Sequence, residues 1–124
     1  MKITALDMFQ LQVADWSAMV DWYRTNFAGE VLFSEPADRF CLMKLGEGGA
    51  QLALYGRDGV DLPAVGGRWF PCIQVQDVDA LVADCRRKGI AILTELHGSE
   101  GYRMATLADP EGNAIHVYAW LHAP

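Results

Sequence analysis

The chain has 124 residues, of which 52% are hydrophobic and 21% charged, and this is the length and composition of one globular domain. The formal net charge is −6 and the longest basic run is Arg86-Arg87-Lys88, so neither a nucleic-acid surface nor an anionic membrane surface is an expected partner. An N-terminus without an apolar signal segment, apolar runs too short to span a bilayer, and three scattered cysteines together predict a cytoplasmic protein with reduced thiols.

The first half of the chain predicts a strand, a helix and three more strands. Residues 9–13 alternate between apolar and polar side chains, which is typical of a strand with one buried face. Asp15 then suits the N-cap of a helix whose apolar stripe extends to Phe27, and Gly29 is expected to end that helix. Further strands are predicted at residues 30–34, 39–45 and 51–55.

The second half repeats this order after a linker that contains several glycines and a proline. Residues 71–75 predict a strand, Asp77 caps the next helix, and Gly89 ends it after three basic residues that favour a helix C-terminus. The turn Asp109-Pro110-Glu111-Gly112 separates the last two strands. Strands are predicted at residues 90–95, 102–107 and 114–118.

The two halves also align residue by residue, which indicates an internal repeat. Leu11, Val13 and Asp15 match Ile73, Val75 and Asp77 at one constant offset. Each half therefore predicts a β-α-β-β-β module, and two like modules are expected to bury their apolar faces together. We expect one domain over residues 1–124, with module 1 at about 5–56, a linker at about 57–68 and module 2 at about 69–120.

Three motifs resemble the vicinal oxygen chelate superfamily, which groups glyoxalases, bleomycin-resistance proteins and extradiol dioxygenases. They are Leu11-Gln12-Val13-Ala14-Asp15, its echo Ile73-Gln74-Val75-Gln76-Asp77, and the closing Leu107-Ala108-Asp109-Pro110-Glu111-Gly112-Asn113 before a strand. The resemblance covers nearly the whole chain. It implies an α+β, glyoxalase-like fold in which two tandem βαβββ modules form a curved mixed sheet, or partial barrel, around a cavity. It also implies a homodimer.

Metal-dependent members of that superfamily place one ligand on the first and one on the last strand of each module. The resemblance transfers these four positions to Met8, Ala53, Phe70 and His116. Only His116 is a good donor to a divalent cation, whereas a catalytic metal normally needs about three protein ligands. We therefore expect no metal and no cofactor.

Strand alternation predicts which side chains face the cavity. Phe9, Leu11 and Val13 are expected to pack on the helix, which leaves the alternate residues to face inward. Four glutamines fall on the inward face, where they either bind a ligand or form a polar wall in water. The predicted ligand-binding residues are Met8, Gln10, Gln12, Gln51, Ala53, Tyr55, Phe70, Cys72, Gln74, Met104, Thr106, His116 and Tyr118.

Two of these residues have chemistry of their own. His116 is the candidate catalytic residue, as a general base or a ligand-binding donor, although a purely structural histidine is an equal alternative. Cys72 could be a nucleophile paired with His116, but a buried, inert thiol is the expectation. His97, before Gly98, is expected in a loop.

Three functions fit these residues. The favoured one is a protein of the sequestration or resistance type that binds a small aromatic or heterocyclic molecule in a metal-free cavity. The alternative is a metal-independent lyase or isomerase with His116 as general base. Less favoured is a metal-dependent lyase or dioxygenase that combines His116 with Glu95 or Glu100. The sequence leaves open whether the protein is an enzyme.

Overall fold

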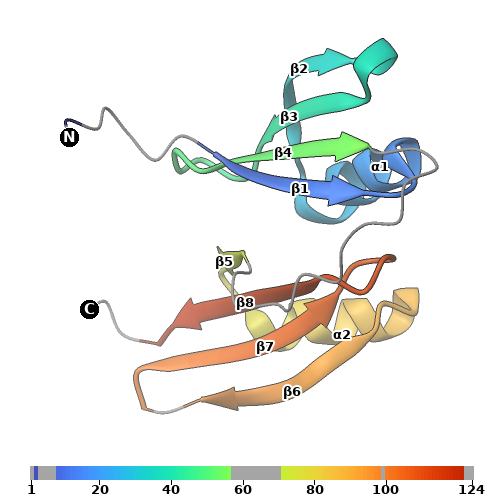
Figure 1. Cartoon of the computed structure of the whole chain (residues 1–124). Coiled ribbons are helices and arrows are strands. Elements are labelled where there is room, and N and C mark those ends of the chain that lie inside the picture. The colour runs from blue at the N-terminus through green and yellow to red at the C-terminus, as the bar shows by residue number, and fades with distance from the viewer. Residues whose placement is uncertain (1, 3–7, 57–70, 99, 122–124) are drawn as a thin grey trace. The chain divides into compact units, whose positions relative to one another are not determined.

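A computed structural model describes residues 2, 8–56, 71–98 and 100–121. The chain forms two compact units, Met1–Ala64 (unit 1) and Val65–Pro124 (unit 2), which repeat one order of elements (Figure 1). Unit 1 contains β1 (Phe9–Val13), α1 (Trp16–Phe27), β2 (Glu30–Glu35), the short 3-10 helix η1 (Pro36–Asp38), β3 (Phe40–Lys44) and β4 (Gln51–Gly56). Unit 2 contains β5 (Cys72–Gln74), α2 (Val78–Lys88), β6 (Ile92–Gly98), β7 (Tyr102–Ala108) and β8 (Ala114–Trp120).

Each unit has a four-stranded mixed sheet with the same topology. The strand orders are β1-β4-β3-β2 and β5-β8-β7-β6, so the first strand of each unit lies beside its last. Those two strands are parallel, and the other neighbours are antiparallel. The predicted α+β class and the β-α-β-β-β order are confirmed. In the described parts of the chain, neither helix is long and apolar enough to cross a membrane.

The first helix begins as the sequence predicts. The Asp15 carboxylate accepts a hydrogen bond from the Ala18 backbone N–H at 3.2 Å, which satisfies one of the free amides of the first turn. The Trp16 indole N–H donates to the Leu54 carbonyl at 3.0 Å and ties α1 to β4. Tyr23 of the same helix is buried, with 1% of its surface exposed. The helix therefore covers one face of this sheet.

The end of α1 differs from the prediction in its detail. The left-handed residue that stops the helix is Ala28, with φ of 49°, and not Gly29. Gly29 has a different role, because a Cβ at that position would lie 2.7 Å from the sulfur of Met43, and the Met43 side chain would have to shift. The glycine therefore allows β3 to approach the end of the helix.

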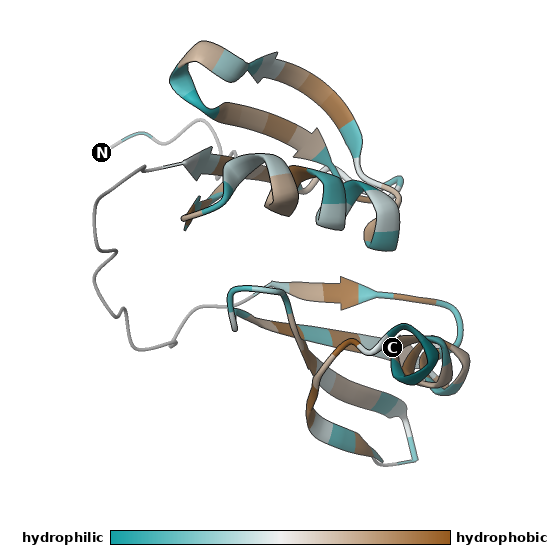
Figure 2. Ribbon diagram, turned by 90° about the vertical axis from the view of Figure 1, so that its right-hand side faces the viewer, coloured by the Kyte–Doolittle hydropathy of each residue, from teal (hydrophilic) through white to brown (hydrophobic). Residues whose placement is uncertain are grey.

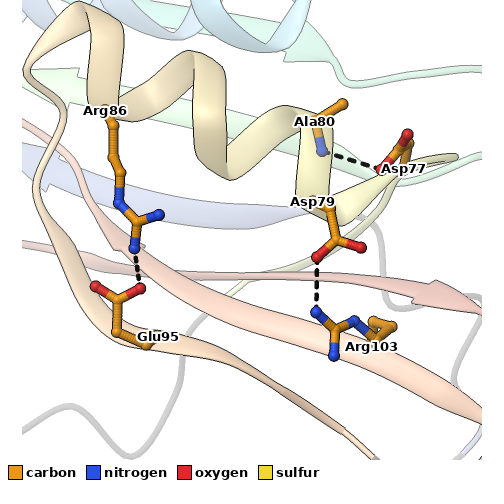
Figure 3. A network of polar contacts seen from close by, with 6 residues as sticks. All are labelled: Asp77, Asp79, Ala80, Arg86, Glu95 and Arg103. Carbon is orange, nitrogen blue, oxygen red and sulfur yellow. Dashed lines mark hydrogen bonds and ion pairs between the residues drawn. The ribbon is translucent and has the colours of Figure 1, made fainter.

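The second helix begins and ends at the predicted residues. Asp77 accepts a hydrogen bond from Ala80 N–H at 3.0 Å, and Gly89 adopts φ of 73° at the C-cap. Two ion pairs join α2 to the sheet (Figure 3): Arg103 of β7 contacts Asp79 at 2.6 Å, and Arg86 contacts Glu95 of β6. All four side chains are at least 37% exposed, so these pairs fix orientation more than they add stability.

The core of each unit lies between its helix and its sheet. Hydrophobic residues occur in the strands and helices of both units (Figure 2), and Leu54 of β4 and Val117 of β8 are fully buried. The prediction for β1 is confirmed only in part. Val13 is fully buried and Leu11 is half-buried, but Phe9 is 46% exposed, because it lies at the open start of an edge strand.

Strand β2 lies at the end of its sheet and has every residue exposed. Leu32 is 45% and Phe33 50% exposed, and a glutamate stands at each end of the strand. A hydrogen bond with Asp38 and the negative charge of that residue raise the pKa of Glu35 above its ordinary value.

The predicted turn between β7 and β8 is confirmed and is centred on a buried carboxylate. Asp109 is 4% exposed and accepts hydrogen bonds from the backbone N–H groups of Glu111 and Asn113, both at 2.9 Å. The Asn113 side-chain amide donates to the second carboxylate oxygen at 2.8 Å. These bonds compensate for burial of the charge and fix where β8 begins.

Asp109→Ala should lower the free energy of unfolding by about 3 kcal/mol, because it leaves several amide N–H groups without their acceptor. Urea unfolding followed by circular dichroism measures the loss. Asp77→Ala is the control in the same unit, since it removes one exposed cap and should cost about 1 kcal/mol. Equal losses for the two variants would contradict the role given to Asp109.

Candidate functional site

In unit 2 the sheet face turned away from α2 mixes polar with aromatic and other apolar side chains. Arg103 contacts Asp79 of α2, so the odd-numbered residues of β7 that share its face, and their partners on β8, look toward the helix. The even-numbered residues of β7 and β8 lie on the opposite face, and two of their rows continue into β5 and β6. One row is Cys72, His116, Thr106 and Thr94, and the next is Gln74, Tyr118, Met104 and His97.

These rows bring together the six predicted residues of the second module that the structure describes. Cys72, Gln74, Met104, Thr106, His116 and Tyr118 share this one face. Phe70 lies outside the described residues. That this face binds a ligand stays a prediction, and we refer to it as the unit 2 face.

In unit 1 the predicted residues also lie on the face turned away from the helix. A Cβ on Gly56 would lie 2.8 Å from the Cβ of Trp16 in α1, so the even-numbered residues of β4 face the helix, and Gln51, Ala53 and Tyr55 point to the other side. The rows there are Gln10, Ala53, Leu42 and Phe33, and then Gln12, Tyr55, Phe40 and Glu35. Met8 is half-buried and precedes β1. Ala53 is fully buried, with Gln10 and Leu42 beside it in its row.

The prediction that His97 lies in a loop is wrong. His97 belongs to β6 and stands in the row of Met104 and Tyr118. Strand alternation could not place it, because the register of β6 shifts twice between Ile92 and His97. The only signal in the sequence was the run of strand-forming residues that leads up to it.

His116 lies in an environment that favours its neutral form. The side chain is half-buried, and this burial lowers the pKa of its imidazole below the ordinary value. The positive charge of His97 lowers that pKa further. A neutral imidazole can accept a proton or a hydrogen bond at pH 7, as the candidate roles of His116 require.

The expectation that Cys72 is a buried thiol is also wrong. Cys72 is exposed, whereas Cys41 and Cys85 are buried. Burial raises the pKa of the Cys41 and Cys85 thiols. Cys72 differs from both because β5 is the edge strand of its sheet, with β8 on one side only.

Within residues 8–56, 71–98 and 100–121, no group of three or more His, Cys, Asp or Glu side chains could hold a metal ion. Of the four positions transferred by resemblance, Met8 and Ala53 belong to unit 1 and His116 to unit 2. An open hollow of about 470 Å³ lies at the start of α1 and contains none of the predicted site residues. It is lined by Ala14, Asp15, Trp16, Ser17 and Arg39.

Residues 5–117 match the sequence pattern of the Glyoxalase/Bleomycin resistance protein/Dioxygenase superfamily. The chain belongs to this superfamily. No curated protein matches it at a significant level.

Several solved structures share the superfamily fold. TnmS3, described as an antibiotic binding protein from Streptomyces sp. CB03234, is 23% identical with a TM-score of 0.74, over 97% of this chain and 98% of that one. A lactoylglutathione lyase from Agrobacterium tumefaciens is 22% identical with a TM-score of 0.71, over 94% of each chain. Protein ATC0852 from the same organism is 27% identical with a TM-score of 0.76, over 97% of this chain and all of that one.

The lowered pKa of His116 implies that the stability of the folded chain depends on pH. The folded chain binds fewer protons than the unfolded chain between the two pKa values of this residue. Its stability should therefore fall as the pH decreases from about 6.5 through the lower, folded-state pKa. His116→Gln should remove the part of the stability loss that comes from protonation of His116. Urea unfolding of both proteins between pH 7.5 and pH 5 would measure the difference.

His97→Gln tests the electrostatic contact directly. Removing the positive charge should move the His116 titration, followed by NMR, upward toward about 6.5. The midpoint should still stay below that value, because burial is the larger cause. An unchanged midpoint would mean that the two imidazoles do not interact.

Proposed function

We propose that this protein binds a small aromatic or heterocyclic molecule on the sheet faces opposite its helices, without a metal, as a sequestration or resistance protein. The observation that supports it most is the composition of the unit 2 face, which combines aromatic, thioether and uncharged polar side chains. Small-molecule sites are mostly apolar with a few placed hydrogen-bonding groups. The fold relative TnmS3, described as an antibiotic binding protein, is consistent with this proposal.

The apolar part of the proposed site comes from two neighbouring strands. Tyr118 and Met104 are cross-strand partners, and both are half-buried. The Tyr118 ring meets Trp120 edge-to-face, with 5.7 Å between ring centroids. These contacts hold the Tyr118 ring in a defined orientation, on which a planar ligand could stack.

The polar part includes an amide and a hydroxyl, which carry no charge. Gln74 contributes an amide next to Tyr118, and Thr106 contributes a hydroxyl next to His116. Neither row of the unit 2 face contains a carboxylate. A neutral ligand with hydrogen-bonding groups therefore suits this face better than a cation.

A metal-independent lyase or isomerase is the second candidate, and one observation favours it. The neutral His116 imidazole could take a proton from a bound substrate at pH 7. A metal enzyme is less favoured, because Glu95, one of the carboxylates that could join His116, pairs instead with Arg86 of α2. Glu100 is exposed.

The domain organisation and the oligomeric state are also part of this proposal. We propose that both units belong to one domain over residues 1–124, joined by a linker at about 57–68. We also propose a cytoplasmic homodimer, which the family resemblance supports. Sedimentation velocity should give a mass of twice 13.7 kDa, and a stable monomer at micromolar concentration would contradict the dimer.

Screening with aromatic antibiotics and planar dyes tests binding by thermal shift and fluorescence. Gln74→Lys should weaken a bound compound at least tenfold, because lysine lacks the amide oxygen that can accept a hydrogen bond beside Tyr118. Ala83→Lys, on the exposed side of α2, should leave the affinity within twofold. Equal effects of the two variants would place the ligand away from the unit 2 face.

His116→Gln separates the two functions. A binding protein should keep most of its affinity, since glutamine can still donate a hydrogen bond. An enzyme that uses His116 as a base should bind its substrate and lose turnover by a factor of about 100 or more. Mass spectrometry of the compound recovered after incubation would detect such turnover.

A further inference from the structure

We propose that Cys72, His116 and Thr106 form a thiol–imidazole–hydroxyl site that adds covalently to α,β-unsaturated carbonyl compounds. The site lies in the first row of the unit 2 face. The inference goes beyond reversible binding, because it assigns a bond-forming reaction to a thiol that the proposed function does not need.

The register of three strands places these side chains in line. Cys72 and His116 are partners in the parallel pair of β5 and β8, and His116 and Thr106 are partners in the antiparallel pair of β8 and β7. Neighbouring strands lie about 4.8 Å apart, and partners extend their side chains from the same face. His116 therefore stands between a thiol on one side and a hydroxyl on the other.

Exposure falls along this row from Cys72 to Thr106, and Thr94 at the far end is exposed again. Cys72 is exposed, His116 is half-buried, and Thr106 is only 6% exposed. The Thr106 side chain carries a hydroxyl that can donate a hydrogen bond. A small molecule that approaches from the side of Cys72 would thus meet the nucleophile first and a hydrogen-bond donor further in.

Each group has one task in the addition. The Cys72 sulfur forms a bond to the β-carbon of the conjugated carbonyl while its proton passes to the neutral His116 imidazole. The electrons of the carbon–carbon double bond move onto the carbonyl oxygen, where Thr106 O–H donates a hydrogen bond to the enolate. The imidazolium then returns the proton to the α-carbon. The product is a thioether adduct, and no oxidant or further reactant is consumed.

The two other cysteines provide an internal comparison. Cys41 is 0% and Cys85 6% exposed, and burial raises the pKa of both thiols. A buried thiol with a raised pKa has little thiolate and little access to reagent. Modification of the folded chain should therefore be confined to Cys72.

The experiment uses acrylamide as the probe, with the full chain at pH 7 and with glutathione as the reference thiol. Peptide mapping by mass spectrometry should find the adduct on Cys72 alone, formed at least ten times faster than on glutathione. His116→Gln should lower the rate of adduct formation on Cys72 at least fivefold. Below pH 7, Cys72 of this variant should react no faster than glutathione. Reaction at the glutathione rate, or an unchanged rate in His116→Gln, would overturn the proposal.

Thr106→Val tests whether the Thr106 hydroxyl stabilises the enolate oxygen or whether residue 106 only affects the access of reagents to Cys72. It should slow acrylamide addition several-fold but leave alkylation by iodoacetamide, which displaces iodide and forms no enolate, within twofold. Thr25→Val, on the exposed side of α1, is the matched control and should change neither rate. Equal slowing of both reagents by Thr106→Val would mean that the variant only disturbs the fold.

The outcome is independent of the binding test. Acrylamide is too small to need the proposed ligand site, so fast modification of Cys72 together with failed dye binding would contradict only the proposed function. Slow modification together with tight dye binding would contradict only the covalent reaction.

Discussion

The parallel pairing of the first and last strand of each unit is the constraint on which the candidate site depends. A helix and two further strands separate β1 from β4 and β5 from β8 along the chain, yet each pair shares a full set of ladder partners. This pairing brings Gln10 beside Ala53 and Cys72 beside His116. If the strands followed one another in chain order as a simple meander, Cys72 and His116 would lie at opposite edges of their sheet.

Much of this arrangement could be predicted from the sequence, because the local signals agree with one another. Alternation predicted the bounds of β1 and which residues of β8 share a face, and the aspartate caps predicted where both helices begin. The internal repeat then extended the topology from one unit to the other. For β7 and β8, odd and even residue numbers were enough to predict which residues share the unit 2 face, because these two strands pair without a register shift.

The sequence was misleading where tertiary context overrides the local pattern. The two register shifts in β6 carry His97 onto the same face as His116, and no periodicity reveals a bulge in advance. Cys72 lies between Pro71 and Ile73 and looks like part of a buried apolar segment, but its exposure depends on β5 being an edge strand. Gly29 looked like a helix stop, whereas its lack of a Cβ serves the approach of Met43.

The exposed strand β2 has a consequence for colloidal behaviour. An outer strand with Leu32 and Phe33 uncovered is a template onto which other extended chains can add, and natural proteins commonly protect such templates with charge. Glu30 and Glu35 stand at its two ends as gatekeepers. Because the pKa of Glu35 is raised, mild acid neutralises this gatekeeper earlier than an ordinary glutamate. The protection of β2 against aggregation therefore weakens as the pH falls below neutrality. This strand is remote in sequence from the thiol and imidazole of unit 2.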